Sequence, residues 1–401
     1  MEVVAGAGFD WLIIDTEHAP IDMFMMVRRL QATMENRTQP VVRIPWNDMV
    51  TVKRVLDAGA QSLLIPMIQT EEEARNVAAE AEDQHRGSGQ RDPPALQRRG
   101  ARLAAARLGA PVFVTQLTTP AAKPGLPVIR STGACNALRS LTPVVQALAA
   151  STVVVDCTVE GLMHAPELPA ILAGGARVIY VSNEHPETLC RLLPSAQVEA
   201  DVKAHIKRLR GVRQMRVTSA AGTDLSIDLQ GAVVGGNWGV TVRPGTLTHW
   251  PGGLVLAFPK AGSVHGTLVL NEGDVNLTFK RYLEKPVTLR IANDHIDAIE
   301  GQGLDADLMR GYIAAWGDRA AYAVSHVGYG LNPAARWDSM ALLDKRDFNG
   351  TELRAFAGNF LYSTGANEVA GRYTLGHFDL PMRQCTVTLD GEVVVRDGQL
   401  A

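Results

Sequence analysis

Two short phrases near the end of the 401-residue chain hold the side chains best suited to chemistry. One is Ser-His-Val-Gly-Tyr-Gly at 325–330, and the other is Gly-His-Phe-Asp-Leu-Pro at 376–381. His377 and Asp379 are two residues apart, so in an extended strand they project to one side while Phe378 faces the core. Joined by a distant histidine, they would make a two-histidine, one-carboxylate set, which leaves coordination positions open and suits non-haem Fe(II). A hydrogen-bonded pair without metal is the alternative for the tripeptide alone.

Antiparallel β-structure is predicted around these phrases, from about 212 to 401. Apolar and polar residues alternate over short runs, and Gly, Asn and Asp mark the turns. We expect hairpins that pair 215–219 with 225–229, 266–270 with 275–279, 287–291 with 295–299 and 385–389 with the run from 393, a strand at 253–258 and an amphipathic helix over 305–316. Residues 212–401 are therefore predicted to form an antiparallel β-rich α+β domain that carries the metal site.

A different α/β pattern precedes that region, over 95–211. We expect strands at 111–115, 152–156 and 177–181, and helices at 95–108, 138–149, 164–173 and across 186–210. The pattern predicts a small doubly wound parallel-sheet domain, in which ligands bind outside the carboxyl ends of the strands. His164 follows one of these strands by a single loop and is expected near such an edge. The sequence has no Gly-x-Gly-x-x-Gly phrase and no Walker loop, so nucleotide binding is not supported.

The first 82 residues predict three β/α units. Strands are expected at 9–15, 40–44 and 62–66, and helices at 21–34, 48–58 and 70–81 with Thr70 as an N-cap. Near-continuous apolar strands that alternate with helices indicate a parallel sheet. A shift to Arg, Gly, Gln and Pro over 83–106 then marks a basic seam.

Composition argues against several classes of protein. Lys and Arg (39) nearly balance Asp and Glu (42), which leaves no basic excess for nucleic acid. The four cysteines are widely spaced, with no Cys-x-x-Cys pair, which favours a reducing compartment over a disulfide or zinc-ribbon scaffold. The first residues lack the positive stretch of a secretory signal, and no apolar run approaches the ~18 residues of a membrane span. We expect a cytoplasmic protein.

The N-terminal segment resembles the HpcH/HpaI class II aldolase family. The phrases that carry the resemblance are Gly-Phe-Asp-Trp-Leu-Ile-Ile-Asp-Thr-Glu-His-Ala-Pro at 8–20, Pro-Val-Val-Arg-Ile-Pro-Trp-Asn-Asp at 40–48 and Gly-Ala-Gln-Ser-Leu-Leu-Ile-Pro-Met-Ile-Gln at 59–69. By this resemblance His18 matches the family's general base and Arg43 its carbonyl-binding arginine. The match stops near Glu80, whereas a (β/α)₈ barrel takes about 250 residues, and the metal-binding Glu and Asp of later strands have no counterpart. We expect a partial (β/α) barrel-like segment, a truncated aldolase fragment over 1–82, in which His18 and Arg43 are inactive.

The rest of the chain, about 90–398, resembles the 2,5-dihydroxypyridine 5,6-dioxygenase family. These iron enzymes cleave the ring in nicotinate and nicotine degradation, and they share an ancestral fold with thermophilic-type metallo-aminopeptidases. The matching phrases are Arg-Leu-Gly-Ala-Pro-Val-Phe at 107–113, Gly-Leu-Met-His-Ala-Pro-Glu at 161–167, His-Trp-Pro-Gly-Gly at 249–253, Gly-Thr-Leu-Val-Leu-Asn-Glu-Gly-Asp at 266–274, Ser-His-Val-Gly-Tyr-Gly-Leu at 325–331, Arg-Ala-Phe-Ala-Gly-Asn-Phe-Leu-Tyr-Ser-Thr-Gly at 354–365 and His-Phe-Asp-Leu-Pro at 377–381. Seven phrases in register indicate the fold and superfamily more strongly than the substrate.

This second resemblance implies a set of site residues. The family's Fe(II) ligands fall on His326, His377 and Asp379, its active-site histidines on His164 and His249, and a substrate-side hydroxyl on Ser363. Three protein ligands leave positions for a hydroxylated aromatic ring and for O₂. A neutral histidine can take the phenolic proton, and a second can stabilise the developing oxyanion. We assign the base to His164 and the substrate or oxygen contact to His249, with the two roles open to exchange.

The sequence also departs from the dioxygenase family. Where the family has an acidic residue ahead of His249, this chain has Gly-Asn-Trp-Gly at 236–239, so contacts to the ring are expected to differ. The family's N-terminal leader and first strand are replaced by the aldolase-like segment. The resemblance implies a homo-oligomer and the conversion of 2,5-dihydroxypyridine to N-formylmaleamate.

Three rival functions are weighed against this one. A two-metal aminopeptidase needs additional carboxylates, but the phrase Pro-Gly-Gly-Leu-Val at 251–255 puts Leu254 where the peptidases have a ligating Glu. An aldolase is disfavoured by the truncation, and a metal-free scaffold is disfavoured by the presence of all three ligands and both histidines. The sequence therefore predicts an Fe(II)-dependent, extradiol-type dioxygenase acting on a small hydroxylated pyridine.

Overall fold

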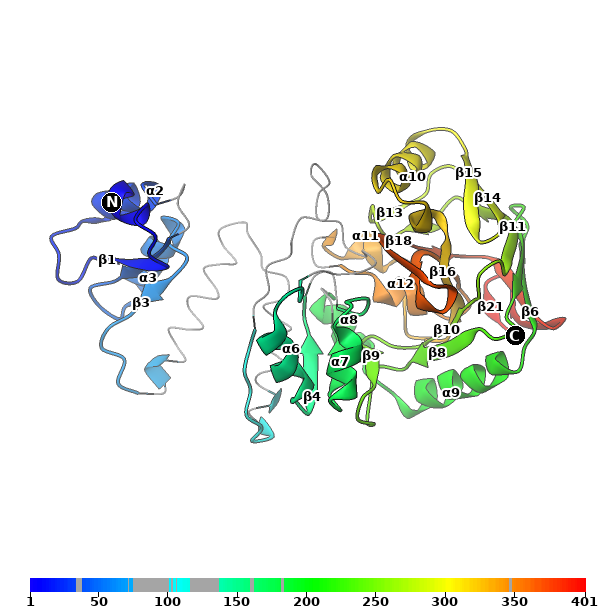
Figure 1. Ribbon diagram of the computed structural model, residues 1–401, viewed down its shortest axis with the longest axis horizontal. Helices are drawn as coiled ribbons and strands as arrows, with labels where there is room; N and C mark the ends of the chain where they lie inside the picture. Colours follow the sequence, from blue (N-terminus) through cyan, green and yellow to red (C-terminus); the bar gives the residue numbers. More distant parts are fainter. Residues whose placement is uncertain are drawn as a thin grey trace. The chain divides into compact units, whose positions relative to one another are not determined.

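The computed structural model describes residues 1–33, 38–70, 72–74, 101, 104–105, 107–115, 137–158, 162–181, 184–345 and 348–401. The chain divides into two compact units, Met1–Asp92 and Pro93–Ala401, each with its own hydrophobic core (Figure 1). The predicted seam at 83–106 lies outside the described residues apart from 101 and 104–105, as does the predicted helix 70–81 beyond residue 74.

The first unit is built on a three-stranded parallel sheet. Its strands are β1 (Trp11–Asp15), β2 (Gln39–Arg43) and β3 (Leu63–Leu64), and its helices are α1 (Glu2–Ala5), α2 (Met23–Gln31) and α3 (Met49–Asp57). Asp22 and Asp48 begin the two longer helices because their carboxylates accept hydrogen bonds from Met25 and Thr51 amides. These elements agree with the predicted β/α units, and the described residues contain no closed barrel.

The two faces of this sheet differ in burial. Leu12 and Ile14 of β1 are buried with Val42 of β2 against the helices, whereas Trp11 and Ile13 on the opposite face are 60% and 40% exposed. Alternation along a strand puts these pairs on opposite sides. One face of the sheet therefore has a core and the other has none within this unit.

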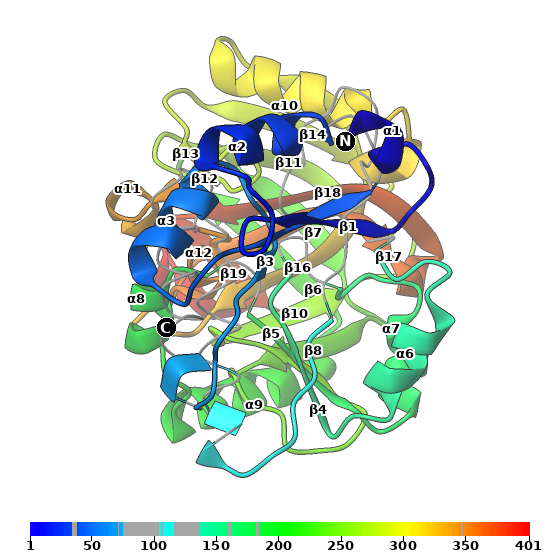
Figure 2. The same cartoon turned by 90° about the vertical axis from the view of Figure 1, so that its left-hand side faces the viewer.

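The second unit begins with another small parallel sheet. Strands β4 (Val153–Asp156), β5 (Arg177–Tyr180) and β9 (Leu247–His249) lie in that order. Helices α6 (Thr142–Ala149) and α7 (Leu168–Ala173) lie side by side next to it (Figures 1 and 2), and α8 (Pro186–Arg191) and α9 (Ala196–Arg210) follow in the chain. The third strand comes from far along the sequence, and its three residues gave no strand signal of their own.

Two large antiparallel sheets form the rest of the second unit. The five-stranded sheet has the order β18-β17-β16-β10-β8, with β8 (Val233–Asn237), β10 (Leu254–Phe258), β16 (Val324–Gly330), β17 (Phe360–Asn367) and β18 (Arg372–Met382). The eight-stranded sheet has the order β15-β14-β11-β7-β6-β19-β20-β21, with β6 (Gln214–Ser219), β7 (Asp224–Asp228), β11 (Val264–Leu270), β14 (Val287–Ala292), β15 (His295–Glu300), β19 (Cys385–Leu389), β20 (Glu392–Arg396) and β21 (Gln399–Leu400). A separate pair joins β12 (Val275–Asn276) to β13 (Arg281–Tyr282), and α10 (Leu304–Ala315), α11 (Ser339–Leu342) and α12 (Thr351–Ala355) complete the unit.

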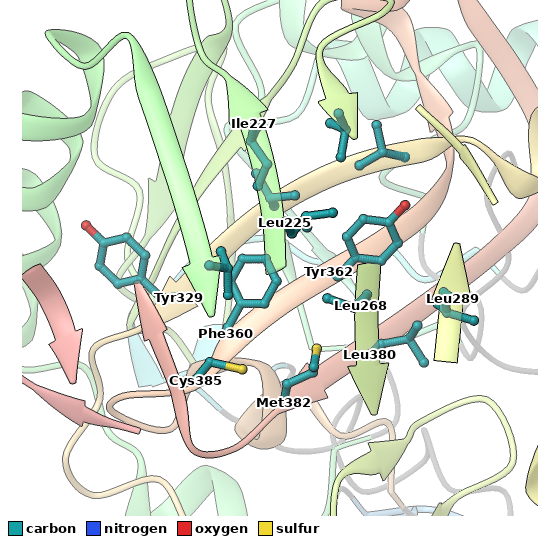
Figure 3. Packing of buried hydrophobic residues seen from close by; sticks show 14 of the residues in the cluster. Leu225, Ile227, Leu268, Leu289, Tyr329, Phe360, Tyr362, Leu380, Met382 and Cys385 are labelled. Carbon is teal, nitrogen blue, oxygen red and sulfur yellow. The ribbon is translucent and has the colours of Figure 1, made fainter. Parts of the chain in front are cut away.

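The main core lies between the two large sheets. Figure 3 shows Leu225, Leu268 and Leu289 of the eight-stranded sheet in one cluster with Phe360 and Leu380 of the five-stranded sheet. Each such side chain contributes roughly 1.5–3 kcal/mol when it leaves water, whereas an exposed ion pair contributes about 0–1 kcal/mol. This core therefore fixes the strands that carry the predicted ligands.

Two predicted β-features are wrong. The run 266–270 does not form a hairpin with 275–279, because β11 pairs with β7 and β14 while β12 pairs with β13. The Asn-Glu-Gly-Asp turn is a local signal, but both edges of β11 are already hydrogen-bonded to β7 and β14 in the eight-stranded sheet, whose apolar side chains pack in the main core. Residues 111–115 form no strand, and the described residues contain no partner strand for them.

The overall class agrees with the prediction at the level of mixed α/β structure. Small parallel sheets with helices come first, and large antiparallel sheets follow. Within the described part of the chain, no helix is long and apolar enough to cross a membrane.

Candidate metal centre

Three adjacent strands bring the predicted ligands together. His326 lies in β16, and both His377 and Asp379 lie in β18, with β17 between the two strands. Phe378 is 1% exposed and belongs to the main core, so the His-x-Asp alternation has the predicted direction. The β16–β17 register shifts between Val324 and Val327, which places His326 in an irregular stretch of its strand.

The Asp379 carboxylate is the centre of this cluster. Its Oδ1 lies 3.2 Å from Nε2 of His377 and 3.7 Å from Nε2 of His326. The two imidazole rings are 5.7 Å apart between centroids, and all three side chains are buried. The prediction that these residues meet in space is therefore consistent with the observed geometry.

Arg354 and Ser363 bind the same carboxylate from its other sides. Nε of Arg354 donates to Oδ2 of Asp379 at 2.6 Å, and the Ser363 hydroxyl donates to Oδ1. Burial by itself raises the pKa of Asp379, but the charge of Arg354 and the interaction with His377 outweigh it, and the pKa lies well below its usual range. Asp379 is thus an ordered carboxylate with one oxygen turned to the imidazoles.

The hydrogen bonds of Ser325 fix the tautomer of His326. The Ser325 hydroxyl donates to the Ala366 carbonyl at 2.5 Å, so its hydrogen is not available to Nδ1 of His326, 3.1 Å from Oγ. Nδ1 must then be the protonated nitrogen, which leaves a lone pair on Nε2. Burial lowers the pKa of His326 to about 3, so the ring is neutral at pH 7. The Nε2 lone pair and the Asp379 carboxylate face each other, an arrangement that a cation between them would stabilise.

His164 lies beside this cluster. Its ring centroid is 5.7 Å from that of His377. The predicted helix 164–173 begins only at Leu168, so His164 stands in the turn before α7 rather than on the helix. That turn is held by Asp156, whose Oδ2 accepts a hydrogen bond from the Leu162 amide at 2.7 Å. Burial and then the neighbouring His377 lower the pKa of His164 to about 4.

His249 ends β9 at the carboxyl edge of the small parallel sheet. Its ring stacks on Tyr180, the last residue of β5, at 5.0 Å between centroids. Nε2 of His249 is buried and has no hydrogen-bond partner among the described residues. Burial, followed by the charge of Arg354, lowers its pKa to about 3. The small sheet thus contributes one neutral imidazole to the region where the two kinds of sheet meet.

The fit of this donor set to a metal ion can be judged from its distances. Two ligands about 2.1 Å from an octahedral ion lie roughly 3.0 Å apart, and the His377–Asp379 contact is close to that value. The His326–Asp379 contact is longer, and no three His, Cys, Asp or Glu side chains of the described residues form a finished cage. A shift of about 0.7 Å would bring the longer contact to ligand spacing. The chemistry of the set, with an unshared lone pair facing a carboxylate, fits a divalent cation.

Other predicted residues lie elsewhere. His18 is exposed and Arg43 pairs with Asp15 in the first unit. Arg354, Ser325 and Asp156 were not assigned a role from the sequence. Arg354 stands in one of the matching phrases, but nothing local marks it as a partner of Asp379, which lies 25 residues further along.

Comparisons with known proteins identify the family of the longer part of the chain. The model of the 2,5-dihydroxypyridine 5,6-dioxygenase family matches residues 90–401. The chain belongs to this family. A 2,5-dihydroxypyridine 5,6-dioxygenase of Pseudomonas putida is 39% identical over 257 residues, 64% of this chain and 72% of that protein. A solved structure of the Pseudomonas putida 2,5-dihydroxypyridine dioxygenase covers 95% of this chain and 98% of its own, with a TM-score of 0.69 and 30% identity.

The N-terminal segment matches a different group. The HpcH/HpaI aldolase/citrate lyase model matches residues 1–165. A 4-hydroxy-2-oxo-heptane-1,7-dioate aldolase of Salmonella dublin is 56% identical over 78 residues, but this chain spans only 30% of that protein. The predicted resemblance of the N-terminal segment to the aldolase family is confirmed, although the family model extends beyond residue 82. This dioxygenase-family member is an enzyme, and its family membership implies a metal cofactor.

Proposed function

We propose that this protein is an Fe(II)-dependent ring-cleaving dioxygenase that converts 2,5-dihydroxypyridine and O₂ to N-formylmaleamate, as a step of nicotinate-type degradation. The ring bond between C5 and C6 breaks, and both atoms of O₂ enter the product, so the reaction needs no external reductant. Support comes from the family match over 90–401 and from the 39% identical Pseudomonas putida enzyme.

The observation that carries the proposal is the cluster around Oδ1 of Asp379, which lies 3.7 Å from Nε2 of His326 and 3.2 Å from Nε2 of His377. His326, His377 and Asp379 would hold the iron. When bound, Fe(II) supplies a site at which an electron-rich ring hydroxylate and O₂ can react. Neutral imidazoles and an ionised carboxylate are the protonation states that ligation requires.

His164 and His249 are proposed to handle the proton and the oxygen. Both rings are neutral at pH 7 because their pKa values are lowered to about 4 and about 3. The His164 imidazole is proposed to accept the proton of a ring hydroxyl, which leaves the ring anionic and more readily oxidised. His249, with Nε2 unpaired, is proposed to contact the substrate or the developing oxyanion. Ser363 is proposed to contact the substrate, since its oxygen can accept a hydrogen bond while its hydroxyl donates to Oδ1 of Asp379.

The finer features of the fold are proposed on the same basis. Strands β4 and β5 would be part of a doubly wound domain over 95–211, with β9 added to their sheet from residues 247–249, and 1–82 would be a partial (β/α) barrel-like piece with no role in ring cleavage. Support comes from the parallel order of each sheet and from the short aldolase match.

The test is metal content and O₂ uptake after anaerobic reconstitution with Fe(II). We expect about one iron per chain and one O₂ consumed per 2,5-dihydroxypyridine. One iron without O₂ uptake would keep the site and reject this substrate. Two metals per chain together with hydrolysis of leucine amide would replace the proposal with an aminopeptidase, despite the buried Leu254 in the position of a ligand.

A further inference from the structure

Arg354 and Ser363 together limit how the Asp379 carboxylate can present itself. Arg354 occupies Oδ2 through Nε at 2.6 Å, and Ser363 donates to Oδ1 from the neighbouring strand β17. Ser363 stands directly opposite Asp379 in the β17–β18 register, so its contact comes from strand pairing itself. With Oδ2 taken, Oδ1 is the oxygen left to face His326 and His377.

The backbone of Arg354 is fixed to the strand that carries His326. The buried Asn359 donates from Nδ2 to the carbonyls of Leu353 and Arg354, at 3.0 and 2.8 Å. Its Oδ1 accepts from the amide of Gly330, the last residue of β16, at 2.7 Å. A Cβ on Gly330 would lie 2.2 Å from the carbonyl oxygen of Phe356. Helix α12 and strand β16 are therefore in backbone contact, and a side chain between them would separate them.

The start of α12 is held in the same manner. The Thr351 amide donates to Oε1 of Glu184 at 2.9 Å, and Glu184 is 1% exposed. Glu352, fully buried, binds Arg191 through both guanidinium Nη atoms at 2.5 and 3.0 Å. A short helix with only intrahelical bonds would fray. Buried side chains at both ends hold it, so the guanidinium of Arg354 starts from a fixed point.

From this geometry we infer that Arg354, aided by Ser363, is a positioning residue that orients Asp379 with Oδ1 toward His326 and His377, and that metal affinity depends on it. The inference rests on the proposed metal site. The planar guanidinium fixes the carboxylate in direction as well as in distance, which an ammonium cannot do. Partners of this kind typically change metal affinity about 10–100-fold when removed.

The experiment measures Co(II) binding to the metal-free full-length protein by calorimetry, together with the visible spectrum of the Co(II) form. We expect Arg354→Gln to weaken Co(II) binding about 10–100-fold and to change the spectrum. Arg354→Lys should recover only part of the affinity, and Ser363→Ala should give a smaller loss. Arg290→Gln is the matched control, since Arg290 pairs with Glu300 on the exposed side of the eight-stranded sheet.

The outcomes separate this inference from the proposed function. A wild-type protein that takes up no Co(II) would contradict the metal site itself. A wild type that binds Co(II), with Arg354→Gln and Ser363→Ala binding equally well and showing the same spectrum, would overturn the positioning role alone. The same holds if Arg354→Gln raises only the KM for the pyridine. Thermal unfolding is recorded for each variant, and if Arg354→Gln does not fold, Ser363→Ala decides the question.

Discussion

The two units of this protein each hold a carboxylate, an arginine and a histidine, but in different surroundings. In the first unit Arg43 donates to Asp15 Oδ1 at 3.0 Å, and His18 lies 3.6 Å from Glu17. The side chains of Asp15 and Arg43 are about one-quarter exposed, and that of His18 is 68% exposed. In the second unit Asp379 and its partners are almost entirely buried.

The difference shows that residue types alone do not fix the geometry of a cluster, and that burial and packing are needed to hold the side chains in place. Solvent around His18 leaves it free to reorient, whereas packing holds His326 by Ser325 and Asp379 by Arg354. A buried charge has to be paired, and Arg354 and Ser363 pair the Asp379 carboxylate from fixed directions. The first unit has three strands and one exposed sheet face, and it cannot enclose its cluster within the described residues.

The largest effect is expected from removing a ligand of the buried cluster. His326→Ala and His377→Ala should each reduce iron from about one per chain to near zero and lower turnover by at least ~100-fold, because each leaves two protein ligands. Metal analysis and O₂ uptake measure the two quantities. His18→Ala is the matched control in the exposed cluster and should change neither. An iron-free His326→Ala variant that still turns over would refute the ligand assignment.

A histidine beside the ligands should behave differently. His164→Ala should keep about one iron per chain and lower kcat by roughly 10²–10⁴-fold, since it removes the proposed base and no ligand. The check is kcat and metal content on the same preparation. His265→Ala, at an exposed position of β11, should leave both unchanged. Loss of iron from His164→Ala would mean that this residue belongs to the ligand set.

Burial of Glu184 should also affect how the free energy of unfolding depends on pH. Burial raises the pKa of Glu184 from 4.5 to about 6, so the folded state holds its proton more tightly than the unfolded state. The contribution of Glu184 to stability is therefore full below about pH 4.5 and decreases as pH rises through 6. Arg354 lowers this pKa and Glu352 raises it, but burial is the larger cause.

Glu184→Gln removes that titration. The free energy of unfolding of the wild type relative to this variant should fall by about 2 kcal/mol between pH 4.5 and 7. Urea unfolding at several pH values measures it. A difference that stays constant, or that grows with pH, would show that Glu184 is ionised in the folded protein.

The smallest effect is expected from the exposed cluster. Arg43→Gln breaks the pair with Asp15 in the first unit, where water can replace its hydrogen bonds. Iron content, kcat and KM for the pyridine should remain at wild-type values. A clear loss of any of them would mean that the first unit takes part in ring cleavage.

Local patterns in the sequence were sufficient for a large part of the fold. The His-Phe-Asp alternation predicts that Phe378 enters the core while His377 and Asp379 share a side, and this is observed. The hairpins 215–219 with 225–229 and 287–291 with 295–299 are also confirmed, since turn residues and alternation act over a few residues. The aldolase-like and dioxygenase-like phrases correctly name the two families that the chain resembles, although the two family models overlap over 90–165.

Only the tertiary structure decided which distant groups meet. The short strand β9 exists because β5 pairs with it, and β11 is paired by β7 and β14 rather than by its neighbour in sequence. The contact of Arg354 with Asp379 and the Ser325 bond that fixes the His326 tautomer depend on strand order and on packing of α12. The sequence by itself determined the chemical groups and their local direction. Their partners were decided by the fold, because long-range pairing follows the burial of whole sheets and leaves no local signal.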